Sequence, residues 1–471
     1  MMKVLIVEDE DASLDETIAV IKAEDPSAEV TAAGDRDTAF KRLAELDFDL
    51  VICDLKIPPA PNDLDASEDH GLAVHARVQE VCPGTPLIFL TGKATPTNVQ
   101  RQLAYGAVAE YYGMASAPLV QLAVKDSSRS EIQYIRDMVQ GLQSLQNCEV
   151  VVHGPREANE LLSRAIQVYG RRLQAHNVEI TLFSGLSGAD VARASFALDN
   201  GQTRAVLVKL QDREDALDEV TRYDLNVPNK LRVGYYAPSI RPSAEYGLRK
   251  KVALFYGLAL NTVSLFELAS RDPSAAAGII ESIQTDHEPW TSEHHVQKTN
   301  VGELRRKRLP DDDSRAAPLL EVDWRHAIEA VDVDLRLCTT HGDLHGLNLL
   351  IDPSSRATLI DFGDVGPGSA ALDPVTLEMS FLFHAERPYD PGAPSIEQLR
   401  YWHDLDVYTA GSRYEAVLRA CREWAYRIAP PQTVLATAYA HAARQVKYPD
   451  VANERALAVA ASAGAALLNT L

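Results

Sequence analysis

The sequence lacks long hydrophobic runs and has little cysteine. Its longest nearly apolar stretch, Ala456–Leu468, has 13 residues, fewer than the roughly 20 that a membrane-spanning helix needs, and so predicts a buried terminal helix. The first residues pass from the short apolar run Val4–Val7 directly into acids, without the longer apolar core of a signal peptide. Five cysteines in 471 residues are too widely spaced for a disulfide framework or a Cys/His zinc site. We therefore expect a cytoplasmic protein with reduced thiols.

Positive charge is scarce as well. Lysine and arginine number 46 against 67 aspartates and glutamates, a net charge of -21, and residues 1–145 hold twice as many acids as bases. Because the electrostatic field of such a negative charge repels nucleic acids and membrane surfaces, we expect neither as a partner. The 46% of hydrophobic residues is typical of a globular protein, and 471 residues are more than one hydrophobic core usually holds.

Residues 1 to about 145 alternate short apolar runs with amphipathic stretches. The apolar runs predict strands at Lys3–Val7, Glu29–Ala32, Leu50–Cys53, Pro86–Leu90 and Leu119–Val124. Strands that alternate with helices favour an α/β doubly wound domain around a five-stranded parallel sheet. A ligand of such a domain should lie at the carboxyl ends of the strands.

Charged and hydroxyl side chains follow four of these strands. Glu8 and Asp9 end the first strand and Asp54 ends the third, while Thr91 and Lys125 end the fourth and fifth. Three carboxylates at one edge would repel one another unless a hard cation such as Mg²⁺ held them. A carboxylate neutralised in this way can attack phosphorus and become an aspartyl phosphate. The alternative interpretation is that these acids only cap helices.

Residues 1–145 resemble a response-regulator receiver domain at all of these positions. The resemblance implies the following roles: Asp54 as phosphoacceptor, Glu8 and Asp9 with Asp54 as Mg²⁺ ligands, Thr91 as switch hydroxyl and Lys125 as the contact of the phosphoryl group. It also implies a cognate sensor histidine kinase as partner, and it allows a homodimer through the receiver. A domain that keeps this fold without being phosphorylated is the alternative.

Two features depart from the usual receiver pattern. The loop Ile57–Gly71 after the third strand is longer than such domains usually have, and the helix before the fifth strand looks extended. The last helix, about Ser130–Gln146, is predicted to run directly into the next domain.

The most specific pattern in the chain lies in Thr340–Asp352 and Leu359–Asp364. Within it, Asn348 follows Asp343 by five residues and Asp361 follows by eighteen, with apolar strands between them. A hairpin would bring the three side chains together. Phosphoryl transfer needs one carboxylate to orient or deprotonate an acceptor hydroxyl, and an Asn and a second Asp to hold the metal on the nucleotide phosphates.

This pattern resembles the aminoglycoside phosphotransferase-like branch of the protein-kinase superfamily, which also includes choline, homoserine and fructosamine kinases. The resemblance implies a two-lobed α+β kinase-like fold with ATP and Mg²⁺ as cofactors. By the same match, Asp343 is the catalytic residue, and Asn348 and Asp361 are metal ligands. His341 would support the catalytic loop, and Asp373 would be a structural residue.

An ATP-binding N-lobe should precede this pattern. Strand-like runs predict a small antiparallel sheet: Val178–Phe183, Val191–Ala197 and Arg204–Leu210. Gly185 and Gly188, between the first two runs, would let backbone N–H groups approach phosphates, although a plain hairpin turn also explains them. Lys209, near the end of the third run, resembles the kinase lysine that contacts the phosphates. Glu219 would pair with it, and Glu214 is the alternative.

We therefore expect three parts: a receiver domain at 1–145, a kinase-like N-lobe at 146–257 and a helical kinase-like C-lobe at 258–471. The predicted function is that of a two-component response regulator whose output is an ATP- and Mg²⁺-dependent phosphotransferase. Phosphorylation of Asp54 would gate it, and its acceptor would be a hydroxyl of an unknown small molecule or protein. The alternative is a non-catalytic pseudokinase scaffold that binds nucleotide or a partner protein. The basic run Arg305–Arg308, followed by Asp311–Asp313, indicates a solvated loop.

Overall fold

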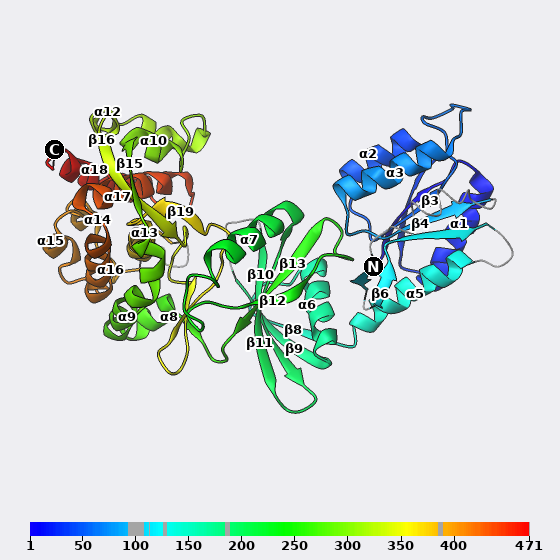
Figure 1. The fold of residues 1–471 in the computed structure, drawn as a ribbon, viewed down its shortest axis with the longest axis horizontal. Helices are drawn as coiled ribbons and strands as arrows, with labels where there is room; N and C mark the ends of the chain where they lie inside the picture. Colours follow the sequence, from blue (N-terminus) through cyan, green and yellow to red (C-terminus); the bar gives the residue numbers. More distant parts are fainter. Residues whose placement is uncertain (93–107, 113, 126–129, 184–188, 385–389, 471) are drawn as a thin grey trace. The chain divides into compact units, whose positions relative to one another are not determined.

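The computed structural model describes residues 1–92, 108–112, 114–125, 130–183, 189–384 and 390–470, and Figure 1 shows the course of the chain. The described residues form two compact units. The first unit comprises Met1–Ala216 and Ser239–Leu258, and the second comprises Leu217–Pro238 and Ala259–Leu471.

The first unit begins with a five-stranded sheet of order β2-β1-β3-β4-β7. Its strands are β1 (Lys3–Val7), β2 (Glu29–Ala33), β3 (Leu50–Asp54), β4 (Leu87–Thr91) and β7 (Val120–Val124). The described helices around it are α1 (Asp11–Glu24), α2 (Arg36–Glu45), α3 (Glu68–Val81) and α5 (Ser130–Leu145). Neighbouring strands are parallel throughout this sheet, so the predicted α/β doubly wound fold class is confirmed.

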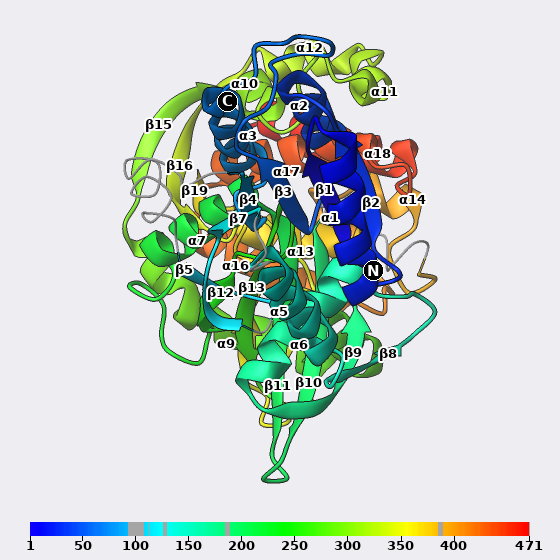
Figure 2. The same cartoon turned by 90° about the vertical axis from the view of Figure 1, so that its right-hand side faces the viewer.

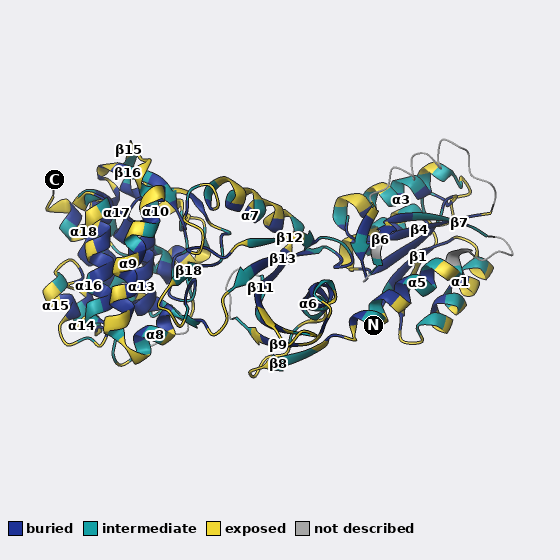
Figure 3. Cartoon of the chain, turned by 60° about the horizontal axis from the view of Figure 1, so that its bottom comes forward, coloured by how far each residue is buried: buried dark blue, intermediate teal, exposed yellow. Residues whose placement is uncertain are grey.

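Alternate residues of each strand face opposite layers of helices. On β1, Val4 and Ile6 belong to the core cluster that contains residues of α1 and α5, whereas Leu5 and Val7 belong to the cluster that contains residues of α2 and α3. Because both faces are covered, the strand is a continuous apolar run and not an alternating one. Figure 3 shows the buried strands between helices whose outer surfaces are exposed.

A β-hairpin lies where the sequence predicted an extended helix. It consists of β5 (Val108–Tyr111) and β6 (Met114–Pro118), so the helix prediction is wrong for these residues, and residues 93–107 lie outside the described part of the chain. The reason is tertiary packing, because the side chains of Tyr111 and Tyr112 are both buried. Such burial outweighs local helix propensity.

The second sheet of the first unit has six strands in the order β12-β13-β11-β10-β9-β8. These are β8 (Glu149–His153), β9 (Ala175–Leu182), β10 (Asp190–Leu198), β11 (Thr203–Asp212), β12 (Ser239–Ala244) and β13 (Lys251–Leu258). The helix α6 (Glu160–Arg172) covers one face with side chains such as Leu162, Ile166 and Tyr169, and Figure 2 shows it against the sheet. The three predicted antiparallel strands correspond to β9, β10 and β11.

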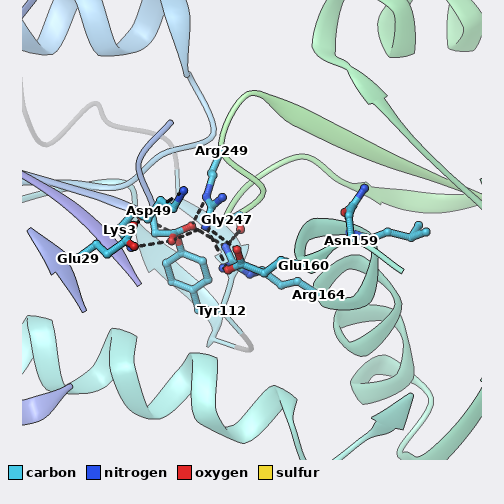
Figure 4. Close-up of polar contacts among 10 residues, drawn as sticks. Lys3, Glu29, Asp49, Tyr112, Asn159, Glu160, Arg164, Gly247 and Arg249 are labelled. Carbon is cyan, nitrogen blue, oxygen red and sulfur yellow. Dashed lines mark hydrogen bonds and ion pairs between the residues drawn. The ribbon is translucent and has the colours of Figure 1, made fainter. Parts of the chain in front are cut away.

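Within the first unit, a buried ion-pair cluster connects the five-stranded sheet, called the receiver sheet below, to this six-stranded sheet (Figure 4). Asp49 lies directly before β3 and is fully buried. Its carboxylate accepts hydrogen bonds from Arg164 on α6 and, in a bidentate arrangement, from Arg249 shortly before β13. Glu160 accepts hydrogen bonds from both arginines, and the Tyr112 hydroxyl donates one to the Asp49 carbonyl oxygen.

The second unit is mainly helical and contains two small sheets. The first sheet consists of β14 (Val263–Ser264), β17 (Leu349–Ile351) and β18 (Ala357–Leu359), in that order. The second consists of β15 (His295–Asn300), β16 (Asp332–Thr340) and β19 (Gly366–Ser369), in that order. The helices are α8 (Leu265–Arg271), α9 (Pro273–Ser292), α10 (Val301–Arg306), α11 (Ala317–Leu320), α12 (Trp324–Glu329), α13 (Leu372–Phe383), α14 (Ile396–Leu399), α15 (Leu405–Thr409), α16 (Glu415–Ile428), α17 (Pro431–Arg444) and α18 (Asn453–Leu468). The last of these contains the predicted terminal helix. Within the described ranges, no helix is long and apolar enough to cross a membrane.

The basic run 305–308 does not form a solvated loop as the sequence predicted. Arg305 is fully buried, and its guanidinium donates hydrogen bonds to the carboxylates of Glu329 and Asp311. The run lies in the last turn of α10 and the residues that follow, so the helical period directs neighbouring side chains to different surroundings. A buried charge of this kind needs carboxylate partners, and one of them, Glu329, lies 24 residues away in the sequence.

Candidate functional sites

The first candidate site is the carboxylate cluster at the carboxyl edge of the receiver sheet. Glu8 and Asp9 follow β1, Asp54 ends the neighbouring strand β3, and the two strands pair in register up to Val7 and Cys53. One carboxylate oxygen from each of the three acids lies within 4.8 Å of the others. Oxygens bound to a single octahedral Mg²⁺ lie about 3–4 Å apart. The arrangement of hard oxygen donors therefore fits a divalent cation.

Lys125 neutralises part of this cluster. Its Nζ lies 2.6 Å from Oε2 of Glu8 and 2.6 Å from Oδ2 of Asp54. Burial would lower the pKa of the Lys125 ammonium, yet its hydrogen bonds to Asp54 and Glu8 raise that pKa above the ordinary value. Burial raises the pKa of the Glu8 carboxyl, although Lys125 acts in the opposite direction. Burial also raises the pKa of Asp9, with a smaller contribution from the nearby Asp54.

Thr91 lies at the same edge of the sheet. It is the residue after Leu90, which is the β4 partner of Asp54, and it pairs with Val124 of β7. Thr91 is buried. The structure therefore places all five predicted receiver residues at one edge of the sheet. The long loop after β3 is closed by a bridge between Ile57 and Ser67.

The second candidate site is the loop between β16 and the β17–β18 hairpin in the second unit. In the hairpin, Leu349 pairs with Leu359, and the Ile360 N–H donates a hydrogen bond to the Asn348 carbonyl oxygen. Asn348 and Asp361 therefore lie beside each other at the open end of the hairpin. The Asn348 Nδ2 donates a hydrogen bond to the Asp343 carbonyl oxygen at 2.9 Å. Because the amide nitrogen is used in this bond, the amide oxygen is the atom of Asn348 suited to a metal ion.

The backbone of this loop adopts two conformations that restrict its sequence. Gly342 has a φ of +85°, and a Cβ atom there would lie 2.3 Å from the Asp364 carbonyl oxygen, so only glycine fits. Asp361 has a φ of +64°, a left-handed conformation that is uncommon for residues other than glycine. Such conformations are concentrated at functional sites. The Asp343 side chain is 39% exposed, and its Oδ2 lies 3.7 Å from the His345 Nε2.

The Asp373 side chain binds the backbone at the start of this loop. Its carboxylate accepts hydrogen bonds from the backbone N–H groups of His341 and Gly342, and its Oδ2 lies 3.0 Å from the His287 Nε2. Burial acts to raise the pKa of Asp373, but the hydrogen bond and charge of His287 outweigh it and lower the pKa below the ordinary value. The Tyr235 hydroxyl and the His287 Nδ1 lie 2.6 Å apart. Sequence reasoning missed His287 and Tyr235, because no local pattern marks residues that act through a distant contact.

The predicted nucleotide-binding residues come from separate parts of the chain. Lys209 is buried on β11, where it pairs with Val191 and Leu254. Glu219 is buried on α7 (Arg213–Asn226), whereas Glu214 in the first turn of that helix is exposed. Burial distinguishes the two predicted alternatives, because buried carboxylates are normally paired. Gly185 and Gly188 lie outside the described residues.

The two candidate sites, apart from Lys125, lie in segments that match different family models. Residues 4–110 match the response regulator receiver domain, and residues 275–408 match the phosphotransferase enzyme family. A comparison with curated proteins found no match to the chain.

Similar solved structures fall into the same two groups. A CheY-like response regulator receiver domain protein from Methanospirillum hungatei is 22% identical, with a TM-score of 0.23, and the match covers 31% of this chain and 98% of that one. A thermostable mutant of aminoglycoside phosphotransferase APH(4)-Ia in its apo form is 12% identical, with a TM-score of 0.35 and coverage of 62% and 94%. A second structure of such a mutant, a ternary complex with ADP and hygromycin B, is 12% identical, with a TM-score of 0.33 and coverage of 58% and 96%. From the two family matches, the chain combines a response-regulator receiver domain with a domain of the phosphotransferase enzyme family.

Proposed function

We propose that the chain is a response regulator whose output is an ATP- and Mg²⁺-dependent phosphotransferase, with the three-part division at 1–145, 146–257 and 258–471. The observation that carries the proposal is the loop of the second unit, where Asp343 and Asn348 are joined by a hydrogen bond and Asp361 lies beside Asn348. The match to the phosphotransferase enzyme family over residues 275–408 supports it.

In the receiver, the Asp54 carboxylate is the proposed phosphoacceptor. A carboxylate oxygen of Asp54 attacks the phosphorus of a phosphodonor, such as a sensor histidine kinase, and the bond from phosphorus to the donor breaks. Glu8 and Asp9, with Asp54, would hold Mg²⁺, which when bound neutralises charge on the phosphoryl oxygens. Lys125, which now contacts Asp54, can contact the phosphoryl group once that group is attached.

In the transferase, Asp343 is the proposed residue that orients the acceptor. Its carboxylate accepts a hydrogen bond from the acceptor hydroxyl, whose oxygen attacks the γ-phosphorus while the bond to the ADP oxygen breaks, and the proton passes to Asp343. Asn348 and Asp361 would hold Mg²⁺, which when bound compensates charge on the nucleotide phosphates. Lys209 is the proposed contact of those phosphates, and Glu219 is its proposed partner.

Phosphorylation of Asp54 is proposed to gate this activity. The buried contacts of Asp49 with Arg164 and Arg249 support a coupling, because they fix the receiver to the six-stranded sheet of the first unit. Asp49 and Asp54 lie at opposite ends of β3, about 16 Å apart along the strand at a rise of roughly 3.3 Å per residue. A signal from Asp54 therefore has to cross the receiver to reach this connection.

The experiment for the proposed function measures phosphate transfer from γ-labelled ATP in the presence of Mg²⁺ and a mixture of hydroxyl compounds. Asp343→Ala should lower the rate at least 100-fold while nucleotide binding persists, because a positioned base contributes typically 10²- to 10⁴-fold. Asp334→Ala, which removes an exposed carboxylate from β16, is the matched control and should leave the rate unchanged.

Asp361→Asn separates metal binding from acceptor orientation. It should weaken the part of nucleotide binding that depends on Mg²⁺, because an amide is a poorer ligand for a hard cation than a carboxylate. Nucleotide binding that does not respond to Mg²⁺ in the unaltered chain, together with no transfer, would instead support a pseudokinase.

A further inference from the structure

Three cationic side chains lie near one another in the second unit, and one of them contacts the catalytic loop. Leu309, next to Arg308, belongs to the same core cluster as Ala443 and Val446, which are next to Arg444 and Lys447. Arg308 follows α10, and its Nη2 lies 3.5 Å from the carbonyl oxygen of Gly342, the residue before Asp343. Arg444 ends α17, and Lys447 ends the short helix after it. The Tyr448 ring connects the last two, with its centroid 5.8 Å from the Arg444 Cζ and 5.0 Å from the Lys447 Nζ.

Arg308, Arg444 and Lys447 are only partly buried, and they differ from the fully buried cations of the unit. Arg305 and Arg422 are each buried against a carboxylate, of Glu329 and Glu378 respectively. In the part of the chain that the structure describes, by contrast, no carboxylate lies within ion-pair distance of Arg308, Arg444 or Lys447, although Asp343 and Asp364 act on Arg308, and Asp313 acts on Lys447, from further away. Because three partly desolvated cations close together repel one another, the cluster is suited to an anion that arrives with a ligand.

The pKa values of two of these groups reflect burial and the neighbouring positive charges. Burial, followed by the charge of Arg444, lowers the pKa of Arg308 to about 10, although Asp343 and Asp364 act to raise it. Burial, followed by the charges of Arg444, Arg315 and Arg308, lowers the pKa of Lys447 to about 8, although Asp313 acts to raise it. Both groups still carry a positive charge at pH 7.

We propose that Arg308, Arg444 and Lys447 form an anion subsite that holds a phosphate or carboxylate group of the acceptor beside Asp343. The inference rests on the proposed function, because it names the acceptor class of the same site: a hydroxyl compound that carries an anionic group. Guanidinium groups bind the oxygens of phosphate and carboxylate in paired hydrogen bonds. A polycationic acceptor such as an aminoglycoside would be repelled by the same three charges.

Binding of inorganic phosphate to the full chain tests the subsite without any transfer step. The titration is made by calorimetry in the presence of Mg²⁺ and ADP, so that nucleotide occupies its own site. Arg444→Gln and Lys447→Gln should each weaken phosphate binding about tenfold or more, because a hydrogen bond to a charged group is typically worth such a factor. Arg444→Lys should restore part of the binding, since it keeps the charge.

Arg400→Gln is the matched control, because Arg400 is an exposed cation that pairs with Glu397 on the surface. Phosphate binding that is absent from the unaltered chain, or that is the same in all four variants, would overturn the subsite.

A second measurement separates the subsite from the proposed function. Turnover is compared for glycerol and glycerol 3-phosphate, for glyceraldehyde and glycerate, and for an aminoglycoside. Faster transfer to the phosphate- or carboxylate-bearing member of a pair, lost in Lys447→Gln, supports the subsite and tells the two anions apart. Transfer to neutral or cationic acceptors that Lys447→Gln leaves unchanged would overturn the subsite while the transferase stands. Phosphate binding that the variants abolish, in a chain that transfers nothing, would support the subsite and contradict the transferase.

Discussion

The carboxylate of Asp49 accepts two hydrogen bonds from Arg249, a residue 200 positions further along the chain. Asp49 is fully buried, and Arg249 is only 7% exposed. The pair joins the start of a receiver strand to the segment before β13, so two sheets that are distant in sequence share one buried ion-pair cluster (Figure 4). This relationship makes the receiver a structural part of the first unit.

Removing the Asp49 carboxylate should destabilise the chain strongly. Asp49→Asn leaves the guanidinium of Arg249 buried without its main partner, and breaking a buried pair typically costs about 3–5 kcal/mol. The free energy of unfolding is measured by urea titration followed by circular dichroism. Asp47→Asn is the matched control, because Asp47 forms a similar pair with Lys250 at the surface, where such pairs contribute little. Equal losses for the two variants would contradict the role assigned to the buried cluster.

The contribution of Asp49 should also depend on pH. Burial alone would raise the pKa of its carboxyl, but the hydrogen bonds and charges of Arg249 and Arg164 lower it below the ordinary value of 3.8. A carboxyl with a lowered pKa in the folded state stabilises that state fully above its unfolded pKa, and the stabilisation is lost as the pH falls through the folded pKa. The difference in stability between the unaltered chain and Asp49→Asn should therefore be constant near pH 7 and shrink below about pH 4. A difference in stability that grows on acidification would contradict a lowered pKa of Asp49 in the folded state.

Asp54 should accept a single phosphoryl group from acetyl phosphate when Mg²⁺ is present. Intact-mass spectrometry would show an adduct that is stable in acid and labile in base, as expected of an acyl phosphate. Replacing both Glu8 and Asp9 by their amides should abolish the adduct, because only Asp54 would remain to hold the cation. An adduct that persists in Asp54→Ala would identify a different phosphoacceptor.

Gly342 should be essential for transfer because the loop leaves no room for a side chain at this position. Gly342→Ala places a Cβ atom 2.3 Å from the Asp364 carbonyl oxygen, so the loop that carries Asp343 has to move. Gly411→Ala is the matched control, because Gly411 has a similar φ of +69° but open space around the added atom, and it should show only the strain of the left-handed conformation. We expect transfer to fall at least 100-fold in the first variant and to change little in the second. Comparable rates in the two variants would contradict the geometry of the loop.

Much of this structure could be predicted from local patterns. The parallel strands are apolar runs between amphipathic helices, and the hairpin that brings Asn348 beside Asp361 follows from two apolar runs around a polar turn. The hairpin at Val108–Pro118 could not be predicted, because it depends on the burial of Tyr112 against a distant part of the sheet. Likewise, the sequence could not distinguish the buried Arg305 from its exposed neighbours, because its partner Glu329 lies 24 residues away.

The same limit applies to the candidate sites. The receiver residues each follow a strand of one parallel sheet, so their common edge could be predicted from the order of elements. The cations beside Asp343 carry no such signal. Arg308 and Arg444 are 136 positions apart in the sequence, and their common surroundings emerge only when the residues after α10 pack against the end of α17.

The measurement that tests the central claim most directly is the rate of ATP-dependent transfer by the full chain with and without beryllofluoride, which mimics phosphate on Asp54. If the receiver gates the transferase, the two rates should differ about 5- to 150-fold, which corresponds to a coupling of about 1–3 kcal/mol. In Asp54→Ala the response to beryllofluoride should disappear. Equal rates with and without beryllofluoride in the unaltered chain, at concentrations that saturate the receiver, would contradict the account.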